Sequence, residues 1–352
     1  MRSAIKVLVV DDSALIRQML TRALSVDPAI EVVGTARTGV EAIEKTLTLD
    51  PDVITLDIEM PELSGIEALP HIMRVSAARV IMLSAVNDSE TTYQALVLGA
   101  TDFIVKPAEG FATSIAELSD VLLKKIKIAY RIRPESRQLA PALKTLTVVK
   151  VNDPSITPPG HLVAIAASTG GPPALETVFS GLDSGFDAAY LVVQHLPHGF
   201  TGSLARRLAR TSDLEFMVAE DGMAVGRGVA YIAPHGLHMV VSGRRTMRIA
   251  LEDTPSMHGV RPAADPLFES VAGAVGAAAI GVVLTGMGTD GARGARSILD
   301  VGGMTIAQDE QTSVVWGMPG AAVRRGAAQR VVPLDSVASE IRRTLRGVKV
   351  HE

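Results

Sequence analysis

Short apolar runs alternate with helical patterns in two stretches of the chain, and a polar segment separates these stretches. In residues 1–125 the apolar runs are continuous, as in IKVLVV at 5–10, which is typical of parallel strands buried on both faces. The remaining expected elements of this stretch are strands at 31–37, 51–57, 79–85 and 103–106 and helices at 13–24 and near 112–127. The pattern predicts a doubly wound α/β domain of flavodoxin-like type.

The same alternation resumes at residue 161 and continues to about residue 347. Expected strands lie at 161–167, 188–195, 279–286 and 303–309, and expected helices at 172–182, 202–210, 265–276, 292–302 and 319–326. Short strands are also expected between 215 and 252, and hairpins are one way of arranging them. This stretch predicts a second α/β domain, Rossmann-like, with three layers and a largely parallel sheet.

Residues 126–160 differ from both stretches. They begin with the basic sequence KIKIAYRIRPESRQL and end in a segment rich in proline and polar residues, with Pro154, Pro158 and Pro159. Prolines oppose regular structure, so we predict a tether between a domain at 1–125 and a domain at 161–347. A basic nucleic-acid-binding arm is the alternative, but the positive charges are few and no helix-turn-helix pattern follows.

The composition of the chain argues against several classes of protein. The 352 residues have a net charge of −4, which argues against a nucleic-acid-binding surface. The absence of cysteine excludes disulfides, thiolate zinc sites and cysteine nucleophiles. The N-terminus lacks the pattern of a signal peptide. Residues 271–289 are uncharged but contain five glycines, so a buried helix followed by a buried strand is expected there instead of a membrane span. We expect a cytoplasmic protein without membrane insertion.

Polar residues follow the expected strands of the first domain. Asp11 and Asp12 end the first strand, Asp57 the third, Ser84 the fourth and Lys106 the fifth. Carboxyl ends of parallel strands meet at one sheet edge, so these groups are expected close together. Clustered carboxylates repel one another unless a cation lies among them, and oxygen ligands suit Mg²⁺.

This set, with DIEMPELSG at 57–65 and Lys-Pro at 106–107, resembles the receiver domain of bacterial response regulators over the whole of 1–125. The resemblance implies phosphorylation by a histidine kinase as phosphodonor. It implies these roles: Asp57 as phosphoacceptor, Asp12 and Asp57 with the Glu59 carbonyl as Mg²⁺ ligands, Asp11 in the outer shell, Ser84 and Lys106 on the phosphoryl oxygens, and Phe103 as the aromatic switch.

In the second domain, Ser168 ends the first expected strand in the sequence IAASTGG. Gly170 and Gly171 allow a tight turn into the next helix, which would present the hydroxyl at the sheet edge, as in a nucleophile elbow. His195 ends the following strand and Asp290 follows a third, so a base and a group to orient it are expected at the same edge.

Other interpretations of these residues stay open. His198 is a rival base, and Asp290 could only cap the helix that follows it. The pairs His195 and His198, or His235 and His238, have a spacing compatible with zinc, although the HExxH motif is absent.

The motifs STGGP, VVQHLPHGFTGSLARRL, LTGMGTDGA and AQDEQTSVVWGMPGAAV resemble the catalytic domain of chemotaxis protein-glutamate methylesterases. The resemblance implies hydrolysis of γ-glutamyl methyl esters on the cytoplasmic helices of chemoreceptors, with glutamine deamidation in some members, and no cofactor for the ester reaction. It implies Ser168 as nucleophile, His195 as general base and acid, Asp290 as its orienting group, the Met287 N–H as oxyanion donor, and Thr169 as a lining residue.

The chain departs from that family at the rim of the expected site. It has Val260-Arg261-Pro262 where His-Arg-Pro is usual, Pro266 is expected to interrupt the start of the next helix, and Gly320 replaces a longer polar residue. The C-terminal RGVKVHE has no aromatic anchor for receptor docking. A phosphorylation-gated interaction module with a degenerate hydrolase fold, and a serine protease, remain as alternatives that activity measurements would discriminate.

Overall fold

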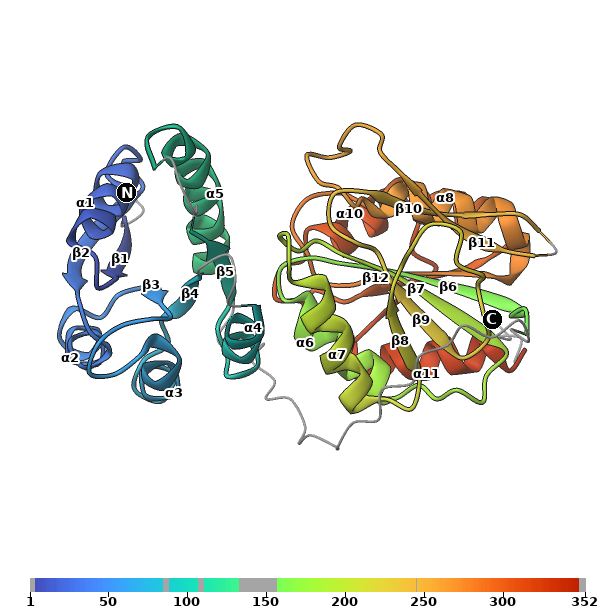
Figure 1. Cartoon of the computed structure of the whole chain (residues 1–352), viewed down its shortest axis with the longest axis horizontal. Coiled ribbons are helices and arrows are strands. Elements are labelled where there is room, and N and C mark those ends of the chain that lie inside the picture. Colours follow the sequence, from blue (N-terminus) through green and yellow to red (C-terminus); the bar gives the residue numbers. More distant parts are fainter. Residues whose placement is uncertain (1–3, 85–88, 107–110, 133–156, 245, 348–352) are drawn as a thin grey trace. The chain divides into compact units, whose positions relative to one another are not determined.

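The computed structural model describes residues 4–84, 89–106, 111–132, 157–244 and 246–347. The chain divides into two compact units, Met1–Leu139 and Ala140–Glu352. Most of the expected tether, 133–156, and the end of the C-terminal segment, 348–352, lie outside the described residues. Each unit is an α/β domain, as the pattern of apolar residues predicted (Figure 1).

The first unit contains a five-stranded parallel sheet in the order β2-β1-β3-β4-β5. Its strands are β1 (Ile5–Val10), β2 (Ile30–Ala36), β3 (Val53–Asp57), β4 (Arg79–Ser84) and β5 (Asp102–Val105). The strand order reverses direction between β1 and β3, and ligand sites of doubly wound sheets lie outside the strand ends at such a switch point.

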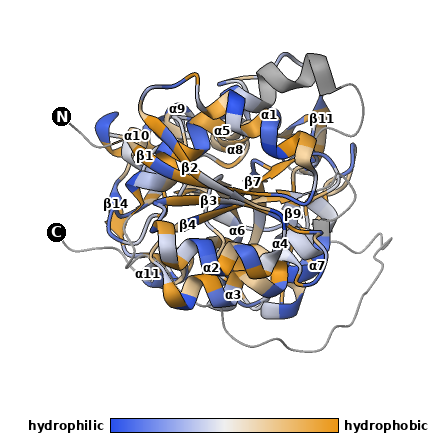
Figure 2. Ribbon diagram, turned by 90° about the vertical axis from the view of Figure 1, so that its left-hand side faces the viewer, coloured by the Kyte–Doolittle hydropathy of each residue, from blue (hydrophilic) through white to orange (hydrophobic). Residues whose placement is uncertain are grey.

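The helices of this unit are α1 (Ala14–Leu24), α2 (Gly39–Leu49), α3 (Gly65–Val75), α4 (Ser89–Val97) and α5 (Phe111–Arg131). Helices α1 and α5 pack together over one face of the sheet. Helices such as α2 have both hydrophilic and hydrophobic residues, as expected of helices that cover a sheet (Figure 2). Helix α5 continues past residue 125 to Arg131 because Ile126 and Ala129 extend its buried face.

The second unit contains a seven-stranded, entirely parallel sheet in the order β14-β13-β12-β6-β7-β9-β8. Its strands are β6 (His161–Ala167), β7 (Ala188–Gln194), β8 (Glu215–Val218), β9 (Val229–Ile232), β12 (Ala279–Val283), β13 (Met304–Gln308) and β14 (Arg330–Val332). The separate antiparallel hairpin of β10 (His238–Ser242) and β11 (Arg248–Glu252) accounts for two of the short strands. The switch point of this sheet lies between β6 and β12.

Helices cover both faces of this sheet, which gives the three expected layers (Figure 1). They are α6 (Gly171–Ser180), α7 (Thr201–Thr211), α8 (Ala264–Val275), α9 (Ala292–Asp300), α10 (Met318–Arg324) and α11 (Leu334–Leu345). The expectation that Pro266 interrupts a helix start was wrong: α8 begins at Ala264, and Pro266 lies in its first turn, where no intrahelical N–H bond is lost.

The uncharged segment 271–289 contains the end of α8, a short 3₁₀ turn (Gly276–Ala278) and the buried strand β12, as expected. Among the described residues, no helix combines the length and the apolar character that crossing a membrane requires.

Candidate functional site

The carboxylates of the first unit meet at its switch point. Asp11 and Asp12 follow β1, Asp57 ends the adjacent β3, and one oxygen of each lies within 4.8 Å of the others. Asp11 and Asp57 are buried. Three carboxylates at this spacing are favourable only with cations among them.

Lys106, directly after β5, supplies one positive charge. Its Nζ lies 2.8 Å from Asp11 Oδ2 and 2.6 Å from Asp57 Oδ1. Burial alone would lower the pKa of Lys106, but its hydrogen bonds to the two carboxylates outweigh that effect and raise it. The lysine is therefore charged and directed at the expected phosphoacceptor.

Asp57 itself has a pKa raised to about 6. Burial is the main cause, and the charges of Asp11 and Asp12 add to it, while Lys106 opposes the rise. One ammonium group therefore does not fully offset this concentration of negative charge.

The two expected switch residues lie inside the unit. Ser84 ends β4 and its hydroxyl is 2.5 Å from that of Thr92 on α4. Phe103 is buried in β5, and its amide N–H donates to the side chain of Asp102. Ser84 thus contacts α4 directly. A movement of its hydroxyl toward a phosphoryl group would therefore break or change its contact with Thr92 of that helix.

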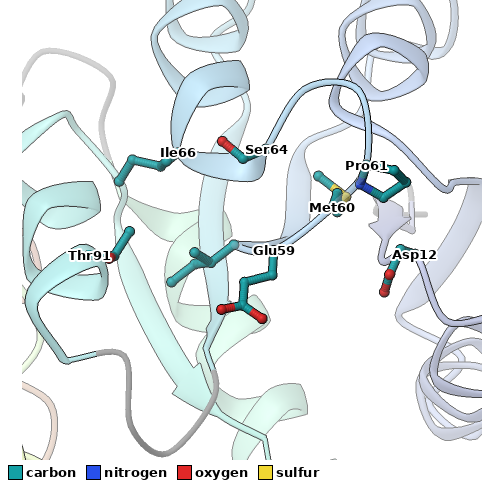
Figure 3. A pocket seen from close by; sticks show the side chains of 8 residues that line it. Asp12, Glu59, Met60, Pro61, Ser64, Ile66 and Thr91 are labelled. Carbon is teal, nitrogen blue, oxygen red and sulfur yellow. The ribbon is translucent and has the colours of Figure 1, made fainter.

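A pocket of about 650 Å³ opens beside the acidic cluster (Figure 3). Asp12 and Glu59 reach it from the segments after β1 and β3, and Thr91 lines it from α4. The residues fit a divalent metal ion, because the donors are oxygens and the cluster has a surplus of negative charge. Asp12, Asp57 and the Glu59 carbonyl would hold Mg²⁺, which would neutralise the phosphoryl oxygens during transfer.

In the second unit, Ser168 directly follows β6 at the switch point. Its amide N–H donates to Thr285 O (3.0 Å), which joins the ends of β6 and β12. Its carbonyl accepts from Gly171 N (2.7 Å), which closes a tight turn into α6. A Cβ at Gly171 would lie 1.9 Å from Gln194 Oε1, so only glycine fits this turn. The strand-to-helix turn therefore has the form predicted for a presented hydroxyl.

His195 follows β7, whose pairing with β6 brings the two strand ends together. The His195 amide donates to Ala167 O (3.1 Å), directly before Ser168. Its Nε2 lies 2.8 Å from Asp290 Oδ2. Among the described residues, neither His195 Nδ1 nor the Ser168 hydroxyl has a hydrogen-bond partner, so Nδ1 is the nitrogen available to accept the hydroxyl proton.

Asp290 lies after β12 and is 1% exposed. Besides His195, its carboxylate accepts hydrogen bonds from the backbone N–H groups of Ala264 (2.7 Å), Asp265 (3.1 Å) and Gly291 (2.9 Å). Burial would raise the pKa of Asp290, but the His195 imidazole and the backbone N–H groups of Ala264 and Asp265 hold it below its usual value. The group is an ionised carboxylate suited to orient an imidazole and stabilise its cation.

Two family models match the chain: CheB methylesterase at residues 163–341 and response regulator receiver domain at residues 7–113. A protein-glutamate methylesterase/protein-glutamine glutaminase of Pyrococcus abyssi is 44% identical, over 98% of this chain and 95% of the relative. A protein of the same description from Symbiobacterium thermophilum is 44% identical over 97% of both chains. The chain belongs to the CheB methylesterase family.

A solved structure agrees with this assignment. The Thermotoga maritima CheB methylesterase catalytic domain matches 54% of this chain and 99% of its own length, with 38% identity and a TM-score of 0.52. The fold and the family resemblance inferred from the sequence are thereby confirmed.

Two further predicted residues lie beside Ser168. Thr169 follows it directly, and its carbonyl accepts from Thr285 Oγ1 (3.0 Å). Met287 is 39% exposed, and among the hydrogen bonds of the described residues its N–H has no acceptor, as an oxyanion donor requires. A Cβ at Gly286 would lie 2.8 Å from Ser168 Cβ, so a glycine lets this loop approach the serine.

A buried polar layer under the CheB serine was not predicted from the sequence. Thr285 Oγ1 also accepts from Val315 N (2.9 Å), and Gln308 Oε1 accepts from Thr285 N (2.8 Å). Gln194 Nε2 donates to Ser168 O (2.9 Å). The available signal was polar residues at the last positions of apolar strands, as in VVQH and TIAQD. These bonds hold the serine turn to its neighbours.

The zinc alternatives fit the geometry poorly. His195 Nε2 is held by Asp290, and His235 Nδ1 is 2.9 Å from Leu196 O. Both ring nitrogens of His238 have backbone partners, the N–H of Ala263 and the carbonyl of Pro255. His198 is exposed and packs edge-on against His235, with ring centroids 6.0 Å apart.

One of the departures at the rim has a local explanation. Nothing in the structure explains Val260, and the neighbouring Arg261, which the usual motif also has, is paired with Asp253 and donates to Thr254 O. At Gly320, a Cβ would lie 3.0 Å from the Trp316 ring, so the small residue leaves room for that indole.

The raised pKa of Asp57 predicts a pH dependence of Mg²⁺ binding. Below about pH 6 the metal must displace a proton from Asp57, so affinity should fall by up to about tenfold per pH unit. Calorimetric titration at pH 5 and pH 7.5 tests this, with Asp57→Asn as the control that should bind more weakly at both values. Equal wild-type affinity at pH 5 and pH 7.5 would contradict the assignment.

Proposed function

We propose that this chain is a phosphorylation-regulated serine hydrolase that removes methyl esters from glutamate side chains of chemoreceptors, and that it also deamidates receptor glutamines. The observation that supports the proposal most is the convergence of Ser168, His195 and Asp290 at one switch point, with the imidazole held at 2.8 Å by a buried carboxylate. The relatives that are 44% identical have names stating both activities.

This geometry supports the following course for the ester reaction. Ser168 Oγ attacks the ester carbonyl carbon while His195 Nδ1 takes its proton. The Met287 N–H donates to the oxyanion. The C–O bond to the methoxy group then breaks, and the imidazolium gives its proton to the departing methoxide oxygen, so that methanol leaves. Water, deprotonated by His195, hydrolyses the acyl-serine to a free glutamate.

Deamidation uses the same intermediate. A glutamine side chain also forms a tetrahedral oxyanion on attack by Ser168, and ammonia leaves in place of methanol. Since both substrates give the same acyl-serine, one site accounts for both activities named for the relatives.

Replacing the catalytic side chains should abolish turnover without unfolding the protein. Ser168→Ala and His195→Ala should each lower methanol release from methylated receptor membranes by at least about 10³-fold, because the nucleophile and base act as a unit. His198→Ala is the matched control and should stay within about threefold of wild type, because His198 is exposed and packs on His235. An inactive His198 variant with an active His195 variant would reverse the base assignment.

Phosphorylation of Asp57 should raise the esterase rate. The phosphoryl group adds charge that Lys106 and Ser84 can bind. Because Ser84 also contacts Thr92, its movement toward the phosphoryl group would change the packing of α4. Asp57→Asn should retain the basal rate and lose the response to a small-molecule phosphodonor. A variant that still responds would mean that the phosphoacceptor lies elsewhere.

A further inference from the structure

Helices α8 and α9 of the catalytic unit begin beside one another, and each lacks a capping side chain of its own. Instead, an aspartate associated with each helix accepts hydrogen bonds from the first N–H groups of the other. Asp290, before α9, accepts the first two N–H groups of α8. Asp265, in the first turn of α8, accepts the Gly294 N–H in the first turn of α9 (2.8 Å). The catalytic aspartate thus belongs to a reciprocal pair of helix caps.

This exchange places two buried carboxylates next to one another. Asp265 is fully buried, Asp290 is 1% exposed, and oxygens of the two lie within 4.8 Å. The helix N-termini favour negative charge at both positions, yet the two charges repel.

His258 lies between the pair. Its Nε2 is 2.7 Å from Asp265 Oδ2 and 3.9 Å from Asp290 Oδ1, and its Nδ1 is 3.5 Å from the Thr289 hydroxyl. Because Nε2 faces two carboxylates, this nitrogen carries a hydrogen atom, and its N–H donates a hydrogen bond to Asp265. The residue is held in this place with a left-handed backbone, φ +56°, a conformation that costs free energy for a non-glycine residue.

We infer that Asp265 and His258 are positioning residues of the hydrolase that act through Asp290. The charge of Asp265 makes the electrostatic potential at the Asp290–His195 pair more negative. The His258 N–H, which donates to Asp265, partly offsets that charge. The inference rests on the proposed hydrolase function for its kinetic consequences. Neither residue touches Ser168, so both act by setting the electrostatic environment of the Asp290–His195 pair.

Other charged groups face this cluster from the neighbouring elements. Arg293 of α9 has Nε 3.9 Å from Asp265 Oδ2, but the same atom is 2.6 Å from Glu269 of α8, which offsets its charge. On the far side of Asp290 lies His195. Among the described side chains, His258 is therefore the one whose donor nitrogen lies within 4.0 Å of both carboxylates.

Asp265→Asn should shift the titration of His195 to lower pH. The asparagine oxygen can still accept the Gly294 N–H, so the cap survives, but one negative charge near the imidazolium is lost. The midpoint of the His195 titration, and with it the acid limb of kcat/KM, should fall by about 0.5 to 1 pH unit. A several-fold lower kcat should accompany it, because the imidazolium of the transition state is less stabilised.

His258→Ala should shift the same midpoint in the opposite direction, upward by about half a unit. It removes the N–H that moderates Asp265, whether the ring is neutral or charged, and leaves the carboxylate held by Gly294. Opposite shifts from two neighbouring positions are a result that a purely structural role would not produce.

The experiment records histidine ¹³Cε1 signals of the full chain against pH, with His195 assigned from the signal missing in His195→Gln. This readout needs no substrate, so it stands even if the wild-type chain fails to hydrolyse receptor esters, a failure that would refute the proposed function separately. kcat/KM profiles on methylated receptor accompany it where activity is present.

Asp187→Asn is the matched control. Asp187 also accepts a backbone N–H, from Gly160 (3.0 Å), but it precedes β7. The seven residues of that strand separate Asp187 from His195, which at about 3.3 Å per residue places the two roughly 25 Å apart. Its variant should leave the midpoint unchanged. Opposite shifts in Asp265→Asn and His258→Ala support the inference. Unshifted midpoints, shifts in the same direction, or a lower melting temperature as the only effect of both would overturn it.

Discussion

A buried, ionised carboxylate at position 290 is the constraint on which the catalytic unit depends. Such a charge is stable only when several donors surround it, and Asp290 has three backbone N–H groups and one imidazole. Two of the N–H groups begin α8 and the third precedes α9. A single side chain therefore caps the start of α8, contacts the residue before α9 and holds the His195 ring.

The two units have the same kind of switch point but compensate their buried carboxylates in different ways. Each is a parallel sheet whose strand order reverses, and each collects its polar residues at that point. In the receiver unit the carboxylates meet one lysine and stay short of positive charge, which raises the pKa of Asp57 and suits a divalent cation. In the catalytic unit the His195 imidazole, together with the backbone N–H groups that begin α8, outweighs the effect of burial and lowers the pKa of Asp290.

Most of the strands, and the polar residues that follow their carboxyl ends, could be predicted because apolar runs end in these polar residues. Contacts set by packing could not be predicted in this way. Asp265 lies in the first turn of a helix and His258 in a loop, so in sequence both have the pattern of ordinary surface or capping residues. Only the approach of α8 to α9 brings them to Asp290. Likewise, Thr285 and Gln308 gain their roles from strand order, which local pattern does not encode.

The most direct test of the account is the turnover of Asp290→Asn on methylated receptor, measured together with its unfolding midpoint. The side chain keeps its shape but loses its negative charge and one of the two oxygens that accept hydrogen bonds from His195 and the backbone. In trypsin, the same replacement of the triad aspartate lowers kcat about 10⁴-fold, and we expect a loss of at least about 10²-fold here with a folded protein. Near-wild-type turnover would contradict the account, because Asp290 would then be a helix cap alone.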